Sequence, residues 1–101
     1  MSGVLVVLAN SVESREDEFN DWYSTVHVPE ILALPSFLSA RRFQLDRRVP
    51  TNSSHGYLTV YEVTDAAVAA GELGAAGQAG RLTLSDALDA EAVIQGFYTQ
   101  I

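Results

Sequence analysis

The sequence predicts an α+β domain whose strands and helices follow the order β-α-β-β-α-β. Three observations lead to this prediction: a valine-rich apolar stretch at 3–9, large apolar residues at helical spacing over 19–26, and an alternating stretch at 57–63. At 101 residues the chain has room for one such domain, which we expect to span residues 1–101. Hydrophobic residues at 48% and charged residues at 19% are typical of a globular protein.

The first strand and the first helix are predicted from the first quarter of the chain. Residues 3–9 are apolar at nearly every position, which predicts a strand that is buried on both faces. Ser14, with Asp17 three residues later, resembles a capping box and places the start of a helix there. Large apolar side chains then follow at helical spacing: Phe19, Trp22, Tyr23 and Val26.

Pro29 is expected to end or kink this helix near His27. A proline disfavours helical geometry at the residue before it and lacks a backbone donor. A proline also suits the first turn of a new helix, so we expect a short helical piece over 29–33. His27 is therefore predicted to lie at a break between two helical pieces.

The middle of the chain predicts a pair of strands. Residues 37–46 have strand character, with Phe43 and Leu45 on one face. Residues 57–63 have the composition and the period of a strand as well, and the polar stretch 47–55 predicts the loop between the two.

The last third predicts a helix, a connection and a final strand. Thr64 and Asp65 precede a helix that is predicted from Ala66 to about Gly80. Glycines recur every third residue within it, and each interior glycine costs about 0.5–1 kcal/mol relative to alanine, so this helix is expected to be weak or broken. A connection is expected over 82–90 and the last strand over 92–101.

This order of elements is the ferredoxin-like arrangement, in which both helices cover one face of a four-stranded antiparallel sheet. The strands at 3–9 and 57–63 both carry apolar residues on their two sides. A monomer would therefore leave an apolar sheet face in water, which usually marks an interface. Packing that face against a second copy removes the exposure, so the sequence predicts a homodimer.

Charge and composition exclude several classes of protein. The formal net charge is −7, from thirteen acidic and six basic residues, whereas nucleic-acid binding needs a basic face that neutralises phosphates. No apolar run approaches the roughly 18 residues that cross a bilayer, and the start of the chain lacks the features of a signal peptide. We therefore expect a cytoplasmic protein with neither nucleic acid nor membrane as partner. The absence of cysteine excludes disulfides and thiolate catalysis.

A family resemblance comes from motifs in the first two thirds of the chain. Glu18–Tyr23 is followed by His27–Glu30, and later motifs lie at Ala33–Phe37, Arg41–Phe43 and Tyr57–Val63. These motifs resemble the first helix and the second and third strands of EthD-like proteins, in the dimeric α+β-barrel superfamily. The string Trp-Tyr-x3-His-x-Pro-Glu is more specific for this family than for any one activity.

The resemblance implies a ferredoxin-like monomer whose sheet packs against that of its partner to give a dimeric α/β barrel. It also implies a pocket in each subunit between the sheet and the helices. The superfamily includes muconolactone isomerases, polyketide cyclases, cofactor-free quinone-forming monooxygenases and haem-binding enzymes. The second helix departs from the family, because it consists mostly of alanine and glycine, which predicts either a roomier pocket or a mobile lid.

His27 is the first candidate for chemistry, because its unperturbed pKa of about 6.5 lets it give or take a proton near neutral pH. Tyr23 lies four residues earlier on roughly the same helical face, where it would orient the ring or donate to a substrate oxygen. We assign these two residues as catalytic. In the alternative interpretation, His27 only caps the broken helix by bonding a free carbonyl.

Five residues are assigned to substrate binding: Trp22, Arg42, Tyr57, Tyr61 and Phe97. The two strand tyrosines share one face and combine an apolar body with a hydroxyl donor. Arg42 would hold a carboxylate or an enolate, although a solvated strand edge is the more common place for such a residue. Trp22 is by its type more often a core residue than part of a ligand site.

No metal site and no cofactor are predicted. Glu30 stands three residues after His27, a spacing that can place two metal ligands on one helical face. Pro29 interrupts the helix between them, and the chain offers only two histidines and no cysteine. Glu30 is instead expected to cap or solvate the short helix.

These observations and the resemblance together predict a cofactor-independent enzyme that acts on a hydrophobic, oxygenated small molecule such as a polyketide or aromatic intermediate. His27 would move a proton next to a carbonyl while a tyrosine stabilises the enolate, as in a cyclase, isomerase or dehydratase. Three alternatives stay open: a cofactor-free monooxygenase of the same fold, a non-catalytic dimer whose pocket captures a small molecule, and a haem-binding protein, which would be coloured.

Overall fold

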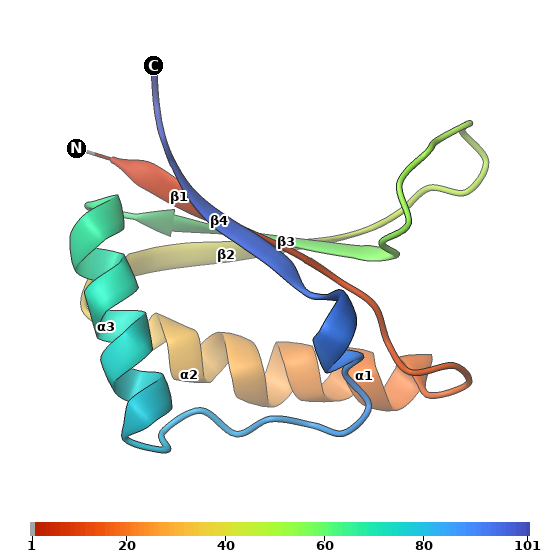
Figure 1. Ribbon diagram of the computed structural model, residues 1–101, viewed down its shortest axis with the longest axis horizontal. Coiled ribbons are helices and arrows are strands. Elements are labelled where there is room, and N and C mark those ends of the chain that lie inside the picture. The colour runs from red at the N-terminus through yellow and green to blue at the C-terminus, as the bar shows by residue number, and fades with distance from the viewer. Residues whose placement is uncertain (1) are drawn as a thin grey trace.

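The computed structural model describes residues 2–101, which form one four-stranded antiparallel sheet covered by helices. Its strands are β1 (Gly3–Ala9), β2 (Phe37–Gln44), β3 (Tyr57–Val63) and β4 (Ile94–Thr99), in the order β2-β3-β1-β4. The helices lie together on one face of the sheet, below it in Figure 1, and no helix of residues 2–101 covers the other, open face. The predicted ferredoxin-like fold is therefore confirmed.

The first helical segment is interrupted where the sequence predicted, because a π turn ends at His27 and a short helix with Pro29 in its first turn follows, but the coil has no gap there. It consists of α1 (Glu16–Trp22), the π-helical turn η1 (Tyr23–His27) and α2 (Val28–Leu32), which follow one another as a single coil in Figure 1. The backbone N–H of Val28 donates to the carbonyl of Tyr23, five residues back. A proline lacks a donor and crowds the carbonyl one turn earlier, and a π turn is a known way for a helix to absorb such a perturbation.

The capping box predicted at Ser14 is also wrong. Ser14 has a φ of +67° and lies outside the helix, while Arg15 occupies the N-cap position without a side-chain cap. The Arg15 guanidinium instead pairs with Glu18 in the first turn and with Asp86, at 2.7 Å, in the distant segment 81–89. The start of α1 is thus held by exposed ion pairs rather than by a cap.

Helix α3 (Ala66–Gln78) is continuous, although weakness was predicted from its glycines. The side chain of Asp65 accepts a hydrogen bond from the backbone N–H of Val68 at 3.0 Å, which caps the start of the helix as predicted. At its end Gly80 has a φ of +70°, and the N–H of Arg81 donates to the carbonyl of Ala76 at 3.0 Å, which is a Schellman motif. Both ends are therefore satisfied, which offsets the cost of the interior glycines.

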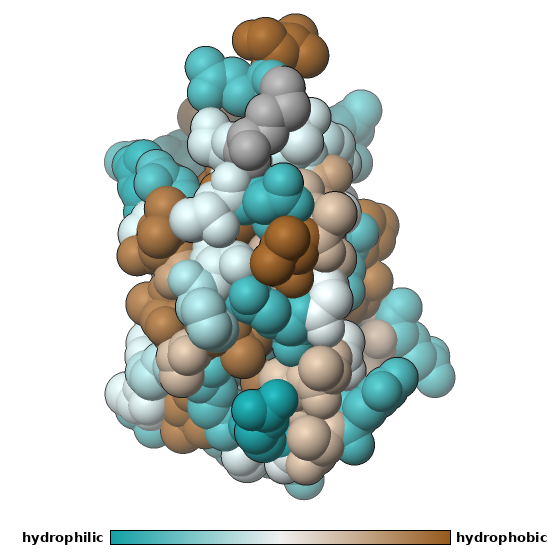
Figure 2. Space-filling view, turned by 90° about the vertical axis from the view of Figure 1, so that its left-hand side faces the viewer, coloured by the Kyte–Doolittle hydropathy of each residue, from teal (hydrophilic) through white to brown (hydrophobic). Residues whose placement is uncertain are grey.

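The glycines of α3 face away from the protein. A Cβ added at position 71, 74 or 77 would meet no atom within 4 Å, whereas Ala69 and Ala76 on the opposite side are buried against the sheet. The side of the molecule that carries α3 and the two chain ends is a mosaic of hydrophilic and hydrophobic residues (Figure 2). Small residues thus let α3 lie close to the sheet without leaving a large apolar surface outside.

The two faces of the sheet differ in burial. Strand β1 alternates strictly: Leu5, Val7 and Ala9 are buried beneath the helices, and the residues between them are only partly buried. The prediction that this strand is buried on both faces is therefore wrong for the single chain. The face without helices, called the open face below, also carries exposed apolar residues from the other strands: Leu38, Phe43, Ile94 and Tyr98.

The connections are longer than the sequence predicted, because β2 ends two residues earlier, at Gln44, and β4 spans only Ile94–Thr99. Segment 81–89 runs beneath α1 and α2 in Figure 1 before a short 3₁₀ turn, η2 (Ala90–Ala92). Among residues 2–101 no helix is long and apolar enough to cross a membrane.

Candidate functional site

A cavity of about 220 Å³ lies between the sheet, the first helical segment and segment 81–89. The sheet forms one side of the cavity and the first helical segment forms the opposite side. These residues line it: Leu5, Val7, Ala9, Trp22, Tyr23, His27, Ile31, Tyr61, Leu73, Leu82, Leu84, Leu88, Val93 and Gln95. Most of the lining is apolar. Leu84 and Gln95 are exposed, so the cavity reaches the surface between segment 81–89 and β4.

Polar atoms without partners gather in and behind this cavity. Within residues 2–101, four buried side-chain atoms lack a hydrogen bond: Tyr23 Oη, His27 Nδ1, Arg42 Nε and Tyr61 Oη. Leaving a buried polar atom unpaired costs about 1–3 kcal/mol, so such atoms are rare and usually mark a place where a ligand or water binds. Three of the four residues line the cavity itself.

His27 is held by two aromatic rings rather than by hydrogen bonds. Its imidazole stacks on Trp22 with ring centroids 4.8 Å apart and an interplanar angle of 25°, and meets the edge of Tyr23 at 4.9 Å. It makes no side-chain cap bond at either junction of the helical segment, so the capping interpretation of His27 does not apply. Its Nδ1 is buried and has no hydrogen-bond partner within residues 2–101.

Burial lowers the pKa of His27, and the Arg42 guanidinium lowers it further, while the Glu30 carboxylate acts in the opposite direction. The imidazole is therefore neutral at pH 7, which is the state that a general base needs. The π turn places this neutral ring, one helical turn after Tyr23, against the same cavity wall.

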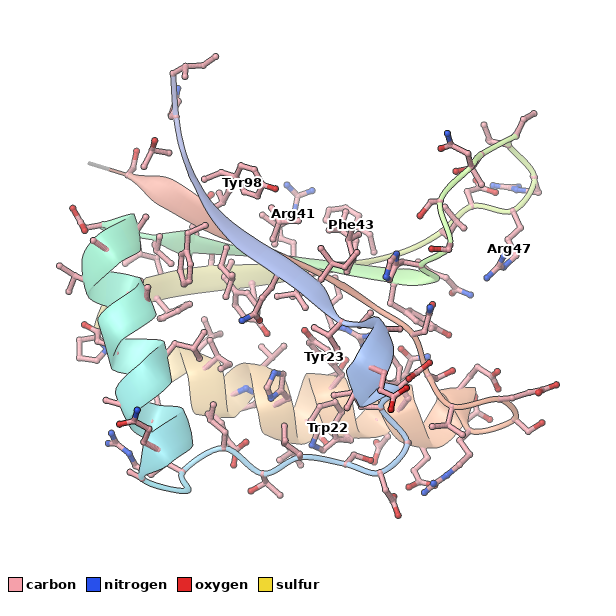
Figure 3. All side chains as sticks on the ribbon, in the orientation of Figure 1. Trp22, Tyr23, Arg41, Phe43, Arg47 and Tyr98 are labelled. Atoms are coloured by element: carbon pink, nitrogen blue, oxygen red, sulfur yellow. The ribbon has the colours of Figure 1, made fainter. Side chains whose placement is uncertain are left out.

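Tyr61 reaches the cavity from β3 and Tyr23 from the helical segment, and both side chains are almost fully buried (1% and 2% exposed). Burial, followed by the neighbouring Tyr23 phenol, raises the pKa of the Tyr61 hydroxyl above its usual range. Tyr61 is therefore a neutral donor at any physiological pH. In Figure 3 the ring of Tyr23 lies between the helix and the sheet, with Trp22 below it on the side of segment 81–89.

Arg42 lies on the covered face of the sheet, not at the solvated strand edge that was the more common expectation. Its guanidinium lies 4.4 Å from the ring centre of Tyr23 and donates to Asn20 Oδ1 and Ser24 Oγ, both at 2.9 Å. Arg41, the preceding residue, stands on the open face with Phe43 and Tyr98 (Figure 3). No carboxylate pairs with Arg42 within residues 2–101, so its charge is compensated only by neutral groups.

Two residues assigned to binding lie outside the cavity. The hydroxyl of Tyr57 accepts a hydrogen bond from Asn20 at 3.3 Å, and its ring packs on Phe19 with centroids 4.9 Å apart. Phe97 is partly buried and packs against the main core. Tyr57 therefore supports the groups that hold Arg42, and neither residue lines the cavity.

The sequence predicted that Glu30 caps the short helix or lies in solvent, but its carboxylate instead tethers segment 81–89. Its two carboxylate oxygens accept hydrogen bonds from the backbone N–H and the hydroxyl of Thr83, at 2.9 and 2.8 Å. The indole N–H of Trp22 donates to the Thr83 carbonyl at 2.9 Å. Three hydrogen bonds thereby hold Thr83 in place, and they keep the neighbouring Leu82 and Leu84 at the cavity wall.

A family comparison adds to this geometry. Residues 4–69 match the family described as Domain of unknown function (DUF4286). The chain belongs to this family. The matched region includes β1, the whole first helical segment and β3, which together supply Trp22, Tyr23, His27 and Tyr61. A comparison with curated proteins finds no match.

Solved structures share the fold of this DUF4286 chain at low sequence identity. A protein from Shewanella loihica PV-4, assigned provisionally as a monooxygenase, superposes with a TM-score of 0.72 at 13% identity, over 99% of this chain and 94% of that one. An ethyl tert-butyl ether D (EthD) family protein from Bacillus halodurans C-125 gives 0.61 at 12% identity, over 98% and 99%. SnoaB, a cofactor-independent oxygenase from Streptomyces nogalater, gives 0.55 at 14%, over 98% and 92%. The EthD-like fold is thus confirmed, and fold alone does not assign an activity.

Several cavity residues of the DUF4286 chain were not identified from the sequence. Leu82, Leu84 and Leu88 come from the connection, and Gln95 comes from an edge strand. The three leucines are spaced like ordinary core residues, and contacts distant in sequence, among them the Thr83 tether and the Arg15–Asp86 ion pair, bring their segment beneath the sheet. A polar residue between apolar ones, as Gln95 is, was the single available signal.

Proposed function

We propose that this protein is a cofactor-independent enzyme that moves a proton on a hydrophobic, oxygenated small molecule, with His27 as the general base. The observation that supports this most is the convergence of unpaired polar atoms of Tyr23, His27 and Tyr61 on an otherwise apolar cavity. A neutral base beside two phenol hydroxyls is the set of groups that enolisation of a ketone needs.

In the proposed step, neutral His27 removes a proton from a carbon next to a carbonyl. The electron pair of that C–H bond forms the enolate double bond, and the carbonyl π pair moves to the oxygen, which accepts hydrogen bonds from Tyr23 and Tyr61. Returning the proton to another carbon completes an isomerisation. Loss of water, or attack of the enolate on a second carbonyl, gives a dehydration or a cyclisation.

Proton exchange tests this proposal without knowledge of the natural substrate. The chain is incubated in D₂O with 2-tetralone, a two-ring enolisable ketone, and loss of the C1 proton signals is followed by NMR. We expect acceleration over buffer, and a loss of about 10²–10⁴-fold in His27→Gln, the usual contribution of a general base. The matched control is His55→Gln, because His55 lies outside the cavity and bonds the Ala92 carbonyl.

The proposal is wrong if the wild-type chain accelerates no exchange, or if His27→Gln exchanges as fast as wild type. Tight binding of ketones without any exchange would instead support the non-catalytic binding protein. A preparation with an intense visible absorbance would support the haem-binding alternative.

The second candidate is a cofactor-free monooxygenase, which the fold shared with SnoaB, a cofactor-independent oxygenase, favours. The first step is the same: His27 makes a carbanion at a CH₂ group. The carbanion then reduces O₂ to a hydroperoxide, which loses water to leave a new carbonyl, so that one O₂ is consumed per product. An oxygen electrode distinguishes the two, because proton exchange alone consumes no oxygen.

We also propose a homodimer formed through the open faces of two sheets. Leu38, Phe43, Ile94 and Tyr98 are between 42% and 61% exposed on that face. Its two charged side chains, Arg41 and Glu62, have opposite signs, so a two-fold related copy need not bring like charges together. These features are typical of a self-complementary interface.

Light scattering after gel filtration tests the dimer. Phe43→Glu places a charge on the open face and should convert the dimer to a monomer at micromolar concentration. Val68→Glu, at an exposed position on α3, is the control and should leave the mass unchanged. A monomeric wild-type chain would contradict the proposal.

A further inference from the structure

The size of the cavity limits its ligand. An apolar protein cavity of about 150 Å³ holds a benzene molecule, and pockets for drug-sized ligands measure about 300–1,000 Å³. The cavity here measures about 220 Å³, between these two values. It has room for one ring or two fused rings, whereas a three- or four-ring molecule would have to protrude through the opening into solvent or displace the walls, which Glu30 and Trp22 tether.

The polar groups of the cavity define where a ligand oxygen would lie. The hydroxyls of Tyr23 and Tyr61 are buried, and neither has a partner in hydrogen-bond geometry within residues 2–101, although the Tyr23 hydroxyl lies close enough to contribute to the raised pKa of Tyr61. A phenol hydroxyl is a donor, so an oxygen that accepts two hydrogen bonds satisfies both. Besides His27, the remaining lining offers mostly apolar side chains and, at the surface, the amide of Gln95.

A positive charge stands directly behind these donors. Arg42 is partly buried over the ring of Tyr23, its neighbours Asn20 and Ser24 are neutral, and its Nε has no partner within residues 2–101. Its charge is felt at both Tyr61 and His27. A partly buried cation without a carboxylate favours negative charge nearby, because the field is screened less there than in water.

We propose that the ligand of this cavity is a one- or two-ring hydroxyaromatic compound or cyclic enol, bound as its oxyanion between the Tyr23 and Tyr61 hydroxyls. Arg42 is the positioning residue that sets the preference for the anion, acting through the two tyrosines rather than by contact. This inference deepens the proposed function by naming the substrate class. It requires the cavity to bind, but it does not require His27 to transfer a proton.

Ionisation of a bound phenol tests the anion preference. 4-Nitrophenol ionises near neutral pH, and only its phenolate absorbs strongly in the visible, so a titration with the full chain reports the pKa of the bound ligand. We expect binding to lower that pKa by about one unit or more. Arg42→Gln should raise it back toward the free value, and Arg42→Lys, which keeps the charge, should retain most of the shift.

A bound pKa equal to or above that of free 4-nitrophenol would overturn the inference, as would equal behaviour of Arg42→Gln and Arg42→Lys. Should either variant fail to fold, Tyr61→Phe removes a single hydroxyl and keeps the ring. It is expected to weaken binding of the phenolate about tenfold and to leave binding of nitrobenzene unchanged. Equal losses for both ligands would contradict the role of the hydroxyl.

A size series tests the second half of the inference. Trp22 is the single tryptophan and lines the cavity, so quenching of its fluorescence reports occupancy. 2-Hydroxy-1,4-naphthoquinone should bind at least tenfold more tightly than its methyl ether and than 2-hydroxy-9,10-anthraquinone. Tighter binding of the three-ring compound would overturn the size limit.

The outcome separates this inference from the proposed function. Selective binding of two-ring oxyanions by a chain that accelerates no proton exchange would overturn the function and support the inference. Proton exchange on 2-tetralone with no preference for the oxyanion would do the reverse.

Discussion

The two helical segments that cover the same sheet face are built from opposite kinds of residue. The first, α1 to α2, packs through large rings, among them Phe19, Trp22 and Tyr23, and leaves polar atoms unpaired at the cavity. The second, α3, packs through Ala69 and Ala76 and has both of its ends satisfied. The first segment therefore supplies the buried polar atoms without hydrogen bonds and most of the candidate site. Helix α3 covers the rest of the sheet face with small side chains.

The largest expected difference between the segments is in stability. Phe19→Ala removes a fully buried ring that contacts Trp22, Tyr23 and Tyr57, and it should lower the free energy of unfolding by about 3–5 kcal/mol. Val68→Ala on the exposed side of α3 should change it by less than about 0.5 kcal/mol. Urea denaturation measures both, and equal losses would remove the distinction between the two segments.

The tether of segment 81–89 is the next largest expected effect. Glu30→Ala removes the acceptor of two hydrogen bonds from Thr83, one of them from the backbone, and should cost about 1–2 kcal/mol. Trp22 bonds the same residue, so its fluorescence should shift to longer wavelength as water reaches the indole. Glu13→Ala, at an exposed position, is the control; an unchanged Trp22 spectrum in Glu30→Ala would show that the tether does not hold the cavity wall.

Replacing a glycine of α3 should raise the free energy of unfolding, whereas Phe19→Ala and Glu30→Ala should lower it. Gly74→Ala should stabilise the chain by about 0.5–1 kcal/mol, because the new methyl group meets open space and alanine favours the helix. Gly80→Ala should destabilise it, because position 80 has a φ of +70°. Thermal unfolding compares the two variants, and destabilisation by Gly74→Ala would mean that an unseen partner covers this side of α3.

The smallest predicted effect is the pH dependence that His27 contributes. Burial lowers the pKa of His27 in the folded chain, so the unfolded chain binds a proton more readily as the pH falls below about 6.5. The free energy of unfolding that neutral, buried His27 contributes is fully present above pH 6.5, and it is lost as the pH falls toward the lowered pKa of the folded chain. Urea midpoints at pH 7.5 and 5.5 should therefore differ more in wild type than in His27→Phe. Equal differences would mean that His27 titrates alike in both states.

Much of the fold was predictable because it follows from local pattern. The valine-rich run of β1 and the alternation of β3 were placed at their observed bounds, and the N-cap Asp65 was placed correctly, since each depends on neighbouring residues only. The interruption predicted near His27 was located correctly, but it is a π turn within one coil rather than a gap, because Tyr23 and Ile31 both pack in the core and hold the helical pieces together. The capping box failed for a similar reason, because Arg15 is held by Asp86, 71 residues away.

The sequence by itself determined the order of elements and the residue types that chemistry requires, because periodicity and propensity act over a few neighbouring positions. Only the tertiary structure decided which of those residues meet. Tyr23, His27 and Tyr61 line one cavity, Arg42 stands behind the two tyrosines, and Tyr57 and Phe97 pack elsewhere. The side on which Arg42 lies and the position of segment 81–89 depend on contacts between residues 18 to 71 positions apart, which no local pattern encodes.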